Sequence, residues 1–270
     1  MEGFICKTCG CQYPVSLTPP SSCKICEDER QYVGWDGQLW LTMTEMQAAG
    51  YRNEIRNHEP HLTGIATEPR FGIGQRALLA QTPDGNFLWD PITYLDEQTF
   101  EKVNSLGGIQ GISASHPHFY GAMVEWSHAF GDAPIYVPED DKQWITRPDS
   151  VIRLWRDAVE IFPGLTLIQC GGHFPGSAVV HWQAGFENAG ALFTGDSITV
   201  VQDRRFVSFM WSYPNVVPLG PTEVHGIVDS VKPYSFEGIY GGWWASIVAP
   251  DAKGAVERSA ERYIRHVRGG

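Results

Sequence analysis

Two histidines, His116 and His118, follow a short apolar run and have a single residue between them. On extended backbone, side chains at positions i and i+2 point the same way, so both imidazoles can reach one metal ion. The intervening Pro117 fixes φ and restricts the loop that carries them. Because the chain holds nine histidines, a pair of ordinary loop histidines is the alternative interpretation. This spacing alone does not decide between a metal site and ordinary loop histidines.

Two further loops carry side chains that could bind the same ion. His173 follows the apolar run 165–170, and Asp196 follows the apolar run 191–194, each beside a glycine. Three imidazoles and one carboxylate are a donor set that zinc accepts. Each side chain alone could be a hydrogen-bonded loop residue. The four together, all at the ends of predicted strands, favour a metal site.

Composition limits the classes of function. A chain of 270 residues with 43% hydrophobic and 19% charged residues is typical of a globular protein with one large core or two domains. The net charge of −11 suits neither nucleic acid nor an anionic membrane. No apolar run reaches membrane-spanning length, and the N-terminal residues lack the layout of a signal peptide. We expect a cytoplasmic protein that acts on a small molecule, without nucleic-acid or membrane partners; the sequence says nothing about oligomeric state.

A second group of metal-binding side chains lies near the N-terminus. Two CxxC pairs, Cys6 with Cys9 and Cys23 with Cys26, have 13 residues between them. Each CxxC turn can place two thiolates on one tetrahedral ion, so the two turns predict a Cys₄ site. Disulfides are disfavoured in a cytosolic chain, and a redox CxxC pair is disfavoured by its occurring twice without βαβ context. Cys11 is left over, and we interpret it as a bystander.

The N-terminal stretch resembles a zinc ribbon and also the short rubredoxin-type domain of rubrerythrins, which shares Gly10 and a nearby tyrosine, here Tyr13. Zinc and iron both accept four thiolates in a tetrahedron. We favour zinc as the commoner structural ion and keep iron, which would imply electron transfer, as the alternative. The residues between the two CxxC pairs are polar and turn-rich, so the folding of this module is expected to depend on its metal.

The predicted elements place these side chains at strand ends. Helices are predicted by periodicity and glycine or polar boundaries, and strands by short apolar runs. A hairpin with its turn at 83–86 is indicated by an Asp-Gly pair between two apolar runs. The predicted strands are 75–80, 87–90, 106–112, 134–137, 165–170, 177–182, 191–194 and 236–240, and the predicted helices are 41–50, 99–106, 123–130, 147–160 and 249–267.

The polar loops together resemble a known family. The motifs His116-x-His118, Gly172-His173-x-x-Gly176-Ser177 and Phe193-Thr194-Gly195-Asp196, with Leu88-Trp-Asp90 ahead of them, look like the metallo-β-lactamase fold. Their order and spacing are similar to those of glyoxalase II-like hydrolases. The resemblance implies an α/β fold class, an αββα sandwich with the metal between the edges of two sheets, preceded by the small Cys₄ ribbon. We predict the ribbon at 1–35 and the metallo-β-lactamase-like domain at 36–270.

The departures from the family bear on the number of metals. Where the family loop reads HxHxDH, this chain has Tyr120 and Gly121 in the Asp and final His positions, and Trp243 stands where a further histidine is expected. All three missing groups belong to the second metal of the dinuclear version. The resemblance therefore implies one ion, held by His116, His118 and His173, with Asp196 as a fourth or outer ligand.

We predict zinc at this site too, with iron as the alternative. Asp196 is the candidate base. Tyr120 is the candidate acid or hydrogen-bond donor to an oxyanion, and a purely structural role for it is the alternative.

Two functions remain open. One is a single-metal hydrolase of an ester, thioester or lactone, for which the tryptophans at 126, 211, 243 and 244 suggest a partly apolar substrate. The other is a non-hydrolytic metal-binding protein that serves sensing, electron transfer or partner binding.

Overall fold

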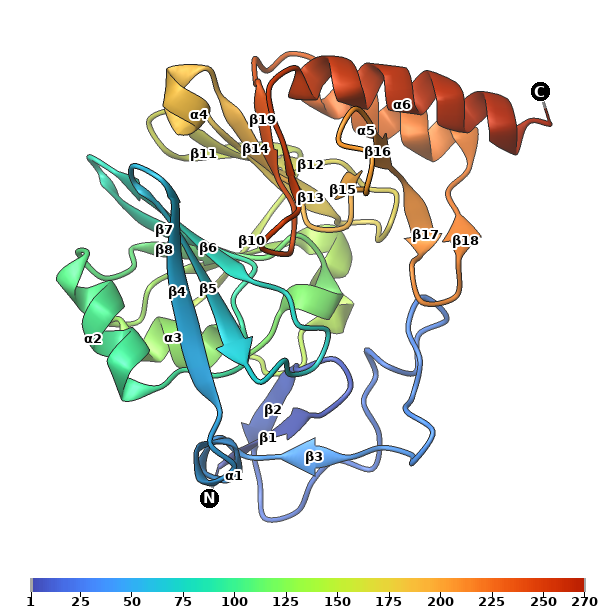
Figure 1. Cartoon of the computed structure of the whole chain (residues 1–270). Coiled ribbons are helices and arrows are strands. Elements are labelled where there is room, and N and C mark those ends of the chain that lie inside the picture. Colours follow the sequence, from blue (N-terminus) through green and yellow to red (C-terminus); the bar gives the residue numbers. More distant parts are fainter. Residues whose placement is uncertain (1, 270) are drawn as a thin grey trace. The chain divides into compact units, whose positions relative to one another are not determined.

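The structure is a computed structural model that describes residues 2–269. It consists of two compact units (Figure 1). The first contains the chain up to Val137 together with Lys142–Leu154, and the second contains Pro138–Asp141 together with the chain from Trp155 onward. None of the helices in the described residues is long and apolar enough to cross a membrane.

The first unit begins with a small antiparallel sheet of three strands. Its strands are β1 (Gly3–Cys6), β2 (Gln12–Val15) and β3 (Trp40–Leu41), in the order β2-β1-β3. Helix α1 (Met43–Ala48) follows. Thr42 caps this helix by accepting from the Glu45 amide, while the Glu45 carboxylate accepts from the Thr42 amide, a reciprocal capping box.

A seven-stranded sheet of order β10-β9-β8-β7-β6-β5-β4 forms the centre of the first unit. The strands are β4 (Arg52–Glu59), β5 (Leu62–Glu68), β6 (Ala77–Thr82), β7 (Gly85–Trp89), β8 (Gly111–Ser113), β9 (Ile135–Pro138) and β10 (Ile152–Trp155). The helical segments are α2 (Glu97–Ser105), η1 (Pro117–Phe119), α3 (Met123–Ala129) and η2 (Glu139–Trp144). Strand β8 runs parallel to both β7 and β9, so the chain leaves all three at the same edge of the sheet. The His116–Gly121 loop starts at that edge.

The prediction of an amphipathic helix at 147–160 is wrong. The chain forms β10 and then β11 (Ala158–Phe162), and Asp157 turns between them in a left-handed conformation with φ of 58°. The apolar residues of this stretch fit a period of two as well as a period of 3.6. The β-branched residues Ile152, Val159 and Ile161 then favour strands.

The second unit has a six-stranded sheet of order β11-β12-β13-β14-β19-β20, in which only the β14–β19 pair is parallel. Besides β11, its strands are β12 (Leu165–Gln169), β13 (Ala178–Trp182), β14 (Ala191–Phe193), β19 (Gly238–Tyr240) and β20 (Ile247–Val248). Two short hairpins pair β15 (Thr199–Val200) with β16 (Val207–Ser208) and β17 (Met210–Ser212) with β18 (Val217–Pro218). The helices are α4 (Gly185–Asn188), α5 (Pro221–Val231) and α6 (Ala252–Val267).

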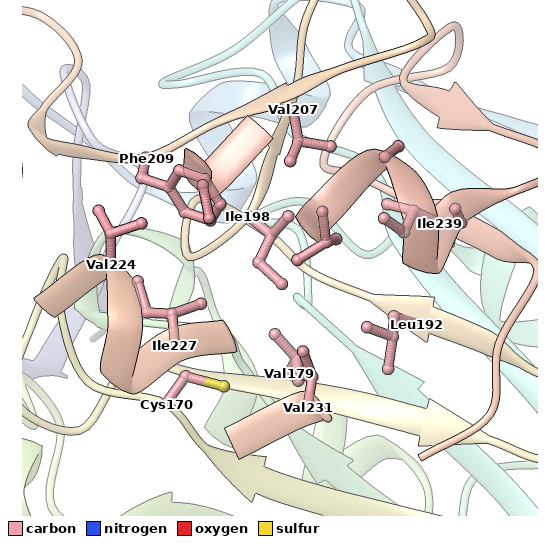
Figure 2. Close-up of a cluster of buried hydrophobic side chains, with 14 of the residues drawn as sticks. Cys170, Val179, Leu192, Ile198, Val207, Phe209, Val224, Ile227, Val231 and Ile239 are labelled. Carbon is pink, nitrogen blue, oxygen red and sulfur yellow. The ribbon is translucent and has the colours of Figure 1, made fainter. Parts of the chain in front are cut away.

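The hydrophobic core of the second unit lies between its sheet and the α5–α6 pair (Figure 2). Val179 and Leu192 come from the sheet, and Val224, Ile227 and Val231 line one face of α5 at helical spacing. The loop after β12 packs on the same core, because a Cβ added to Gly172 would meet Ile227. The residue before His173 is thus packed against this core.

Candidate metal sites

The four N-terminal cysteines meet at one point in the first unit. Sγ of Cys6 lies 3.5 Å from Sγ of Cys26, Sγ of Cys9 lies 3.6 Å from Sγ of Cys23, and all four sulfurs lie within 4.8 Å of one another. Metal–sulfur bonds of about 2.3 Å in a tetrahedron put the sulfurs about 3.8 Å apart. The thiols are buried and unbonded to each other, so the geometry fits a shared cation and not a disulfide pair.

The surroundings of the sulfurs favour thiolates around a cation. Nε2 of Gln38 donates to Sγ of Cys6 over 3.2 Å, and hydrogen bonds from neighbouring thiols hold the pKa of Cys6 well below its usual range. Burial raises the pKa of Cys9. Four buried thiols at this spacing cannot all ionise without a compensating positive charge, which a metal ion supplies.

The loop that carries His116 and His118 is fastened to the end of strand β7. Oδ1 of Asp90 accepts from the Ser115 amide over 2.7 Å, and the Asp90 amide donates to the Ser113 carbonyl over 3.0 Å. Oγ of Ser115 lies 2.9 Å from Nδ1 of His116. A partner on Nδ1 orients the ring so that Nε2 is the nitrogen suited to a metal, which is the usual arrangement around ligating histidines.

Asp90 is itself an unusual residue. It is 2% exposed and has φ of 53°, in the left-handed region that aspartate tolerates better than most residues. Burial raises the pKa of its carboxyl to about 7, against the hydrogen bonds from Ser115 and the charge of Arg76, which lower it. The Asp90 carboxylate, at the end of β7, thus accepts a hydrogen bond from the loop that carries His116 and His118.

His173 is oriented by its own unit. Its Nδ1 donates to the carbonyl of Met210 in β17 over 3.1 Å, which assigns the metal-facing role to Nε2. Asp141, which is fully buried, accepts from the Gly176 amide over 2.9 Å and holds the other end of the same loop. Asp196 is 6% exposed, and the hydroxyl of Tyr213 donates to its backbone carbonyl over 3.4 Å.

The four predicted ligands come together as one group. His116, His118, His173 and Asp196 each offer a ligand atom, these atoms lie within 4.8 Å of one another, and all four residues are buried. Imidazole nitrogens and a carboxylate oxygen suit zinc and other divalent transition metals. The donor set therefore fits a single ion, and its occupancy stays a prediction.

Three residues, Tyr120, Gly121 and Trp243, stand where the resemblance places ligands of a second metal, and their surroundings differ. Gly121 has φ of 50°, and a Cβ added there would lie well inside 3.0 Å of the Pro91 carbonyl oxygen. The side chain of Tyr120 is buried in the first unit, at 1% exposure. Trp243 lies half-buried in the tight turn after β19, where the Ser246 amide donates to its carbonyl. At Gly121 the backbone leaves no room for any side chain.

The family assignment follows from the sequence. The family model described as the metallo-beta-lactamase superfamily matches residues 72–234, and the chain belongs to that superfamily. Its sheet-rich α/β fold, with the four-cysteine cluster at the N-terminus, is the predicted fold class. One relative is the Bacillus subtilis (strain 168) protein named "Uncharacterized protein YmaE", which is 49% identical over 267 residues, 98% of this chain and 97% of that protein.

Solved structures agree on the fold. The metallo-beta-lactamase DIM-1 matches with a TM-score of 0.59 and 13% identity, over 80% of this chain and 98% of that chain. VMB-1 matches with a TM-score of 0.58 and 11% identity, over 81% and 99%. A B3 metallo-beta-lactamase with an active-site glutamic acid matches with a TM-score of 0.55 and 13% identity, over 85% and 97%. At such low identity these similarities show the fold alone.

Sequence reasoning missed the groups that orient the ligands. Ser115 and Asp141 stand in ordinary-looking polar stretches, and the Met210 carbonyl carries no sequence signal at all. Asp90 was part of the recognised motif without a role. Trp126, one of the four tryptophans that suggest a partly apolar substrate, is fully buried in the first unit, where its Nε1 donates to the Ile92 carbonyl over 2.8 Å.

Proposed function

We propose that this protein is a metal-dependent hydrolase whose reaction uses a single ion, held by His116, His118, His173 and Asp196. The grouping of these four buried donors is the observation that carries the proposal. Membership in the metallo-beta-lactamase superfamily supports it. When bound, zinc would supply Lewis acidity, which polarises a carbonyl and lowers the pKa of water. Esters, thioesters and lactones are the proposed substrate class, because each presents such a carbonyl.

The residues around the donor set would divide the remaining work. Asp196, the one carboxylate of the donor group, is also the proposed base, because a carboxylate oxygen can accept a proton from water. Tyr120 follows the two loop histidines and is the proposed donor to the oxyanion that forms as a carbonyl is attacked. Its phenol hydroxyl can donate a hydrogen bond to such an oxygen. Burial of the four donors limits access of bulk water to the reacting groups.

A non-hydrolytic metal-binding protein is the second candidate. The observation that favours it is the lack of space for a side chain at Gly121, which removes one ligand of the second ion. Iron at either site together with no turnover of any ester, thioester or lactone would support this alternative.

Activity and metal content of the same samples test the proposal. We expect His116→Ala to lower turnover by more than the roughly 10–100-fold typical of changes to outer-shell partners. His225→Ala is the matched control, because His225 is exposed on α5. Turnover that survives His116→Ala, or that falls equally in both variants, would show that the donor group is not the active site.

A further inference from the structure

The residues that follow the first CxxC turn contact the histidine loop within the first unit. Sγ of Cys11 donates to the carbonyl of Pro117 over 3.5 Å, and the amide of Gln12 donates to the carbonyl of Gly121 over 3.0 Å. These two carbonyls bracket the segment 117–121, which contains His118. Cys11 is not one of the four grouped cysteines, but its thiol contacts the residue between the two histidines.

The segment that makes these contacts is shaped by the sulfur ligands. The Gly10 amide donates to the Cys6 carbonyl over 2.8 Å, and the Cys6 amide donates to the Cys11 carbonyl over 3.0 Å. Gly10 has φ of 83°, and Oγ1 of Thr93 donates to its carbonyl over 2.8 Å. A cation on Cys6 and Cys9 closes this turn, since both thiolates must point to one centre.

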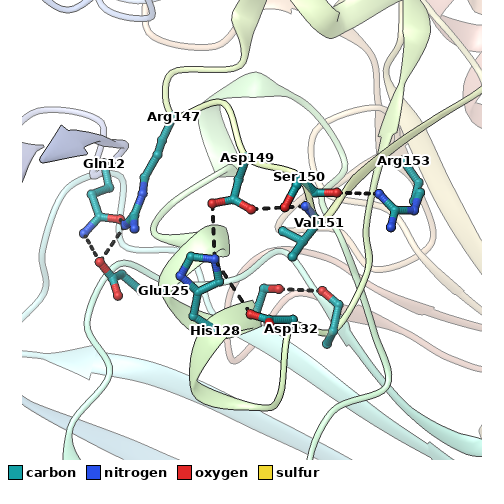
Figure 3. A network of polar contacts seen from close by, with 11 residues as sticks. Gln12, Glu125, His128, Asp132, Arg147, Asp149, Ser150, Val151 and Arg153 are labelled. Atoms are coloured by element: carbon teal, nitrogen blue, oxygen red, sulfur yellow. Dashed lines mark hydrogen bonds and ion pairs between the residues drawn. The ribbon is translucent and has the colours of Figure 1, made fainter.

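A polar network fastens the same segment to the helix that follows the loop (Figure 3). Nε2 of Gln12 donates to Oε1 of Glu125 in α3 over 3.1 Å, and Arg147 donates to the side chains of both Gln12 and Glu125. Gln12 is 2% exposed, whereas the Glu125 side chain is 35% exposed, so the network is only partly screened from water. Oγ1 of Thr146 donates to the Gln12 carbonyl over 2.7 Å.

The second CxxC pair reaches the same region. Nζ of Lys24, between Cys23 and Cys26, donates to the carbonyl of Gln143 over 2.7 Å and to that of Ile145 over 2.8 Å. The residues that follow Ile145 bond to Gln12, whose amide donates to the Gly121 carbonyl, so the second CxxC turn is linked to the histidine loop through Gln12. The thiolate ion would hold the two turns together.

We propose that the ion of the Cys₄ cluster controls metal binding at the His/Asp site, with Cys11 and Gln12 as the positioning residues. Without that ion the 9–12 turn loses its shape, and the Pro117 and Gly121 carbonyls lose their donors. His118 is then less well oriented for coordination. Because the coupling is thermodynamic, the His/Asp ion also favours the ordered Cys₄ cluster. The inference rests on the proposed function in one respect, namely that His116 and His118 bind metal.

The test uses the full chain loaded with cobalt(II), whose thiolate charge-transfer bands report the Cys₄ cluster, while elemental analysis of cobalt per chain counts the further ion at the His/Asp site. Competition with a chelator gives the affinity of the second ion. In Cys23→Ser, which removes a thiolate ligand, we expect loss of the thiolate bands and at least about tenfold weaker binding at the His/Asp site. In Cys11→Ala, which removes the donor to the Pro117 carbonyl and keeps all four thiolate ligands, we expect intact thiolate bands and the same direction of change. The control is Ser16→Ala, which is expected to match wild type. Ser16 lies in the same module, is half-buried, and donates its hydroxyl to the nearby Thr18 carbonyl.

The outcomes separate the two proposals. If Cys23→Ser does not fold, Cys11→Ala decides alone, since it removes the contact with Pro117 and keeps all four thiolates. Wild-type protein with two ions, and variants that keep the second ion within twofold of wild-type affinity, would overturn the coupling and leave the proposed function standing. Wild-type protein that binds cobalt only through thiolates would overturn both.

Discussion

Replacing Gly121 with histidine would place a family-like ligand at the position expected to serve a second metal, and the structure predicts that this fails. A residue other than glycine at φ of 50° costs about 1 kcal/mol. The new Cβ would also lie much closer than 3.0 Å to the Pro91 carbonyl oxygen, a distance below which Cβ contacts essentially never occur. The backbone would have to shift to relieve this clash, and such shifts cost about 1–3 kcal/mol.

The two terms sum to about 3 kcal/mol of lost unfolding free energy, which corresponds to a fall in melting temperature of roughly 6–12 °C for a chain of this size. The Gly121 carbonyl also accepts from the Gln12 amide, so moving the backbone to relieve the clash would disturb that bond. The metal content per chain is therefore expected to stay at or below the wild-type value.

Thermal denaturation and elemental analysis of Gly121→His test this reasoning. Gly226→His is the matched control, because a Cβ at this position of α5 meets nothing within 4 Å and the substitution should change stability by less than about 1 kcal/mol. A Gly121→His protein that melts within about 2 °C of wild type and carries an additional ion would refute the steric argument.

Two further predictions concern Asp90 and His58. Asp90→Ala removes the acceptor of the Ser115 amide and should weaken ion binding at the His/Asp site by roughly 10–100-fold in chelator competition. Asp90→Asn keeps an acceptor and tolerates φ of 53°, so its affinity should stay within a few-fold of wild type. Equal affinities in the two variants would contradict this prediction. Burial, with the charges of Arg76 and Arg56, lowers the pKa of His58 to about 4, below its unfolded value of about 6.5. The folded state thus binds fewer protons, so the free energy of unfolding should fall as pH drops from about 6.5 to about 4, by on the order of 1–2 kcal/mol after allowance for solvent screening. Denaturant titrations across this range should show a shallower fall for His58→Gln, and parallel curves would exclude His58 as the source.

The predicted donor sets rest on strong sequence signals. The CxxC pairs carry their spacing in a few adjacent residues, whereas the His/Asp group, spread over residues 116–196, could be named only from several motifs taken together. The residues that orient them could not be named, because the Ser115–His116 contact and the Asp141–Gly176 bond depend on the path of the backbone. The Met210 carbonyl exists as a partner only once β17 is in place.

The misassigned stretch at 147–160 has a different origin. Ile152, Trp155 and Val159 suit one face of a helix, but a strand pair uses Ile152 and Val159 as well. The left-handed turn at Asp157 decides between the two, and aspartate signals such a turn only weakly. The contact of Cys11 with Pro117 could not be predicted either, since it joins residues 106 positions apart.

The interior of the first unit includes residues from the very start of the chain. Ile5 is fully buried against Met46, Phe71 and Tyr94, and Leu41 packs against the same cluster. Deleting residues 1–35 would strip Ile5 from that cluster and expose aromatic rings to solvent, whatever the cysteines bind. A truncated protein that aggregates would therefore say nothing about the ion, and single-residue replacements at the sulfur ligands are the way to separate the two effects.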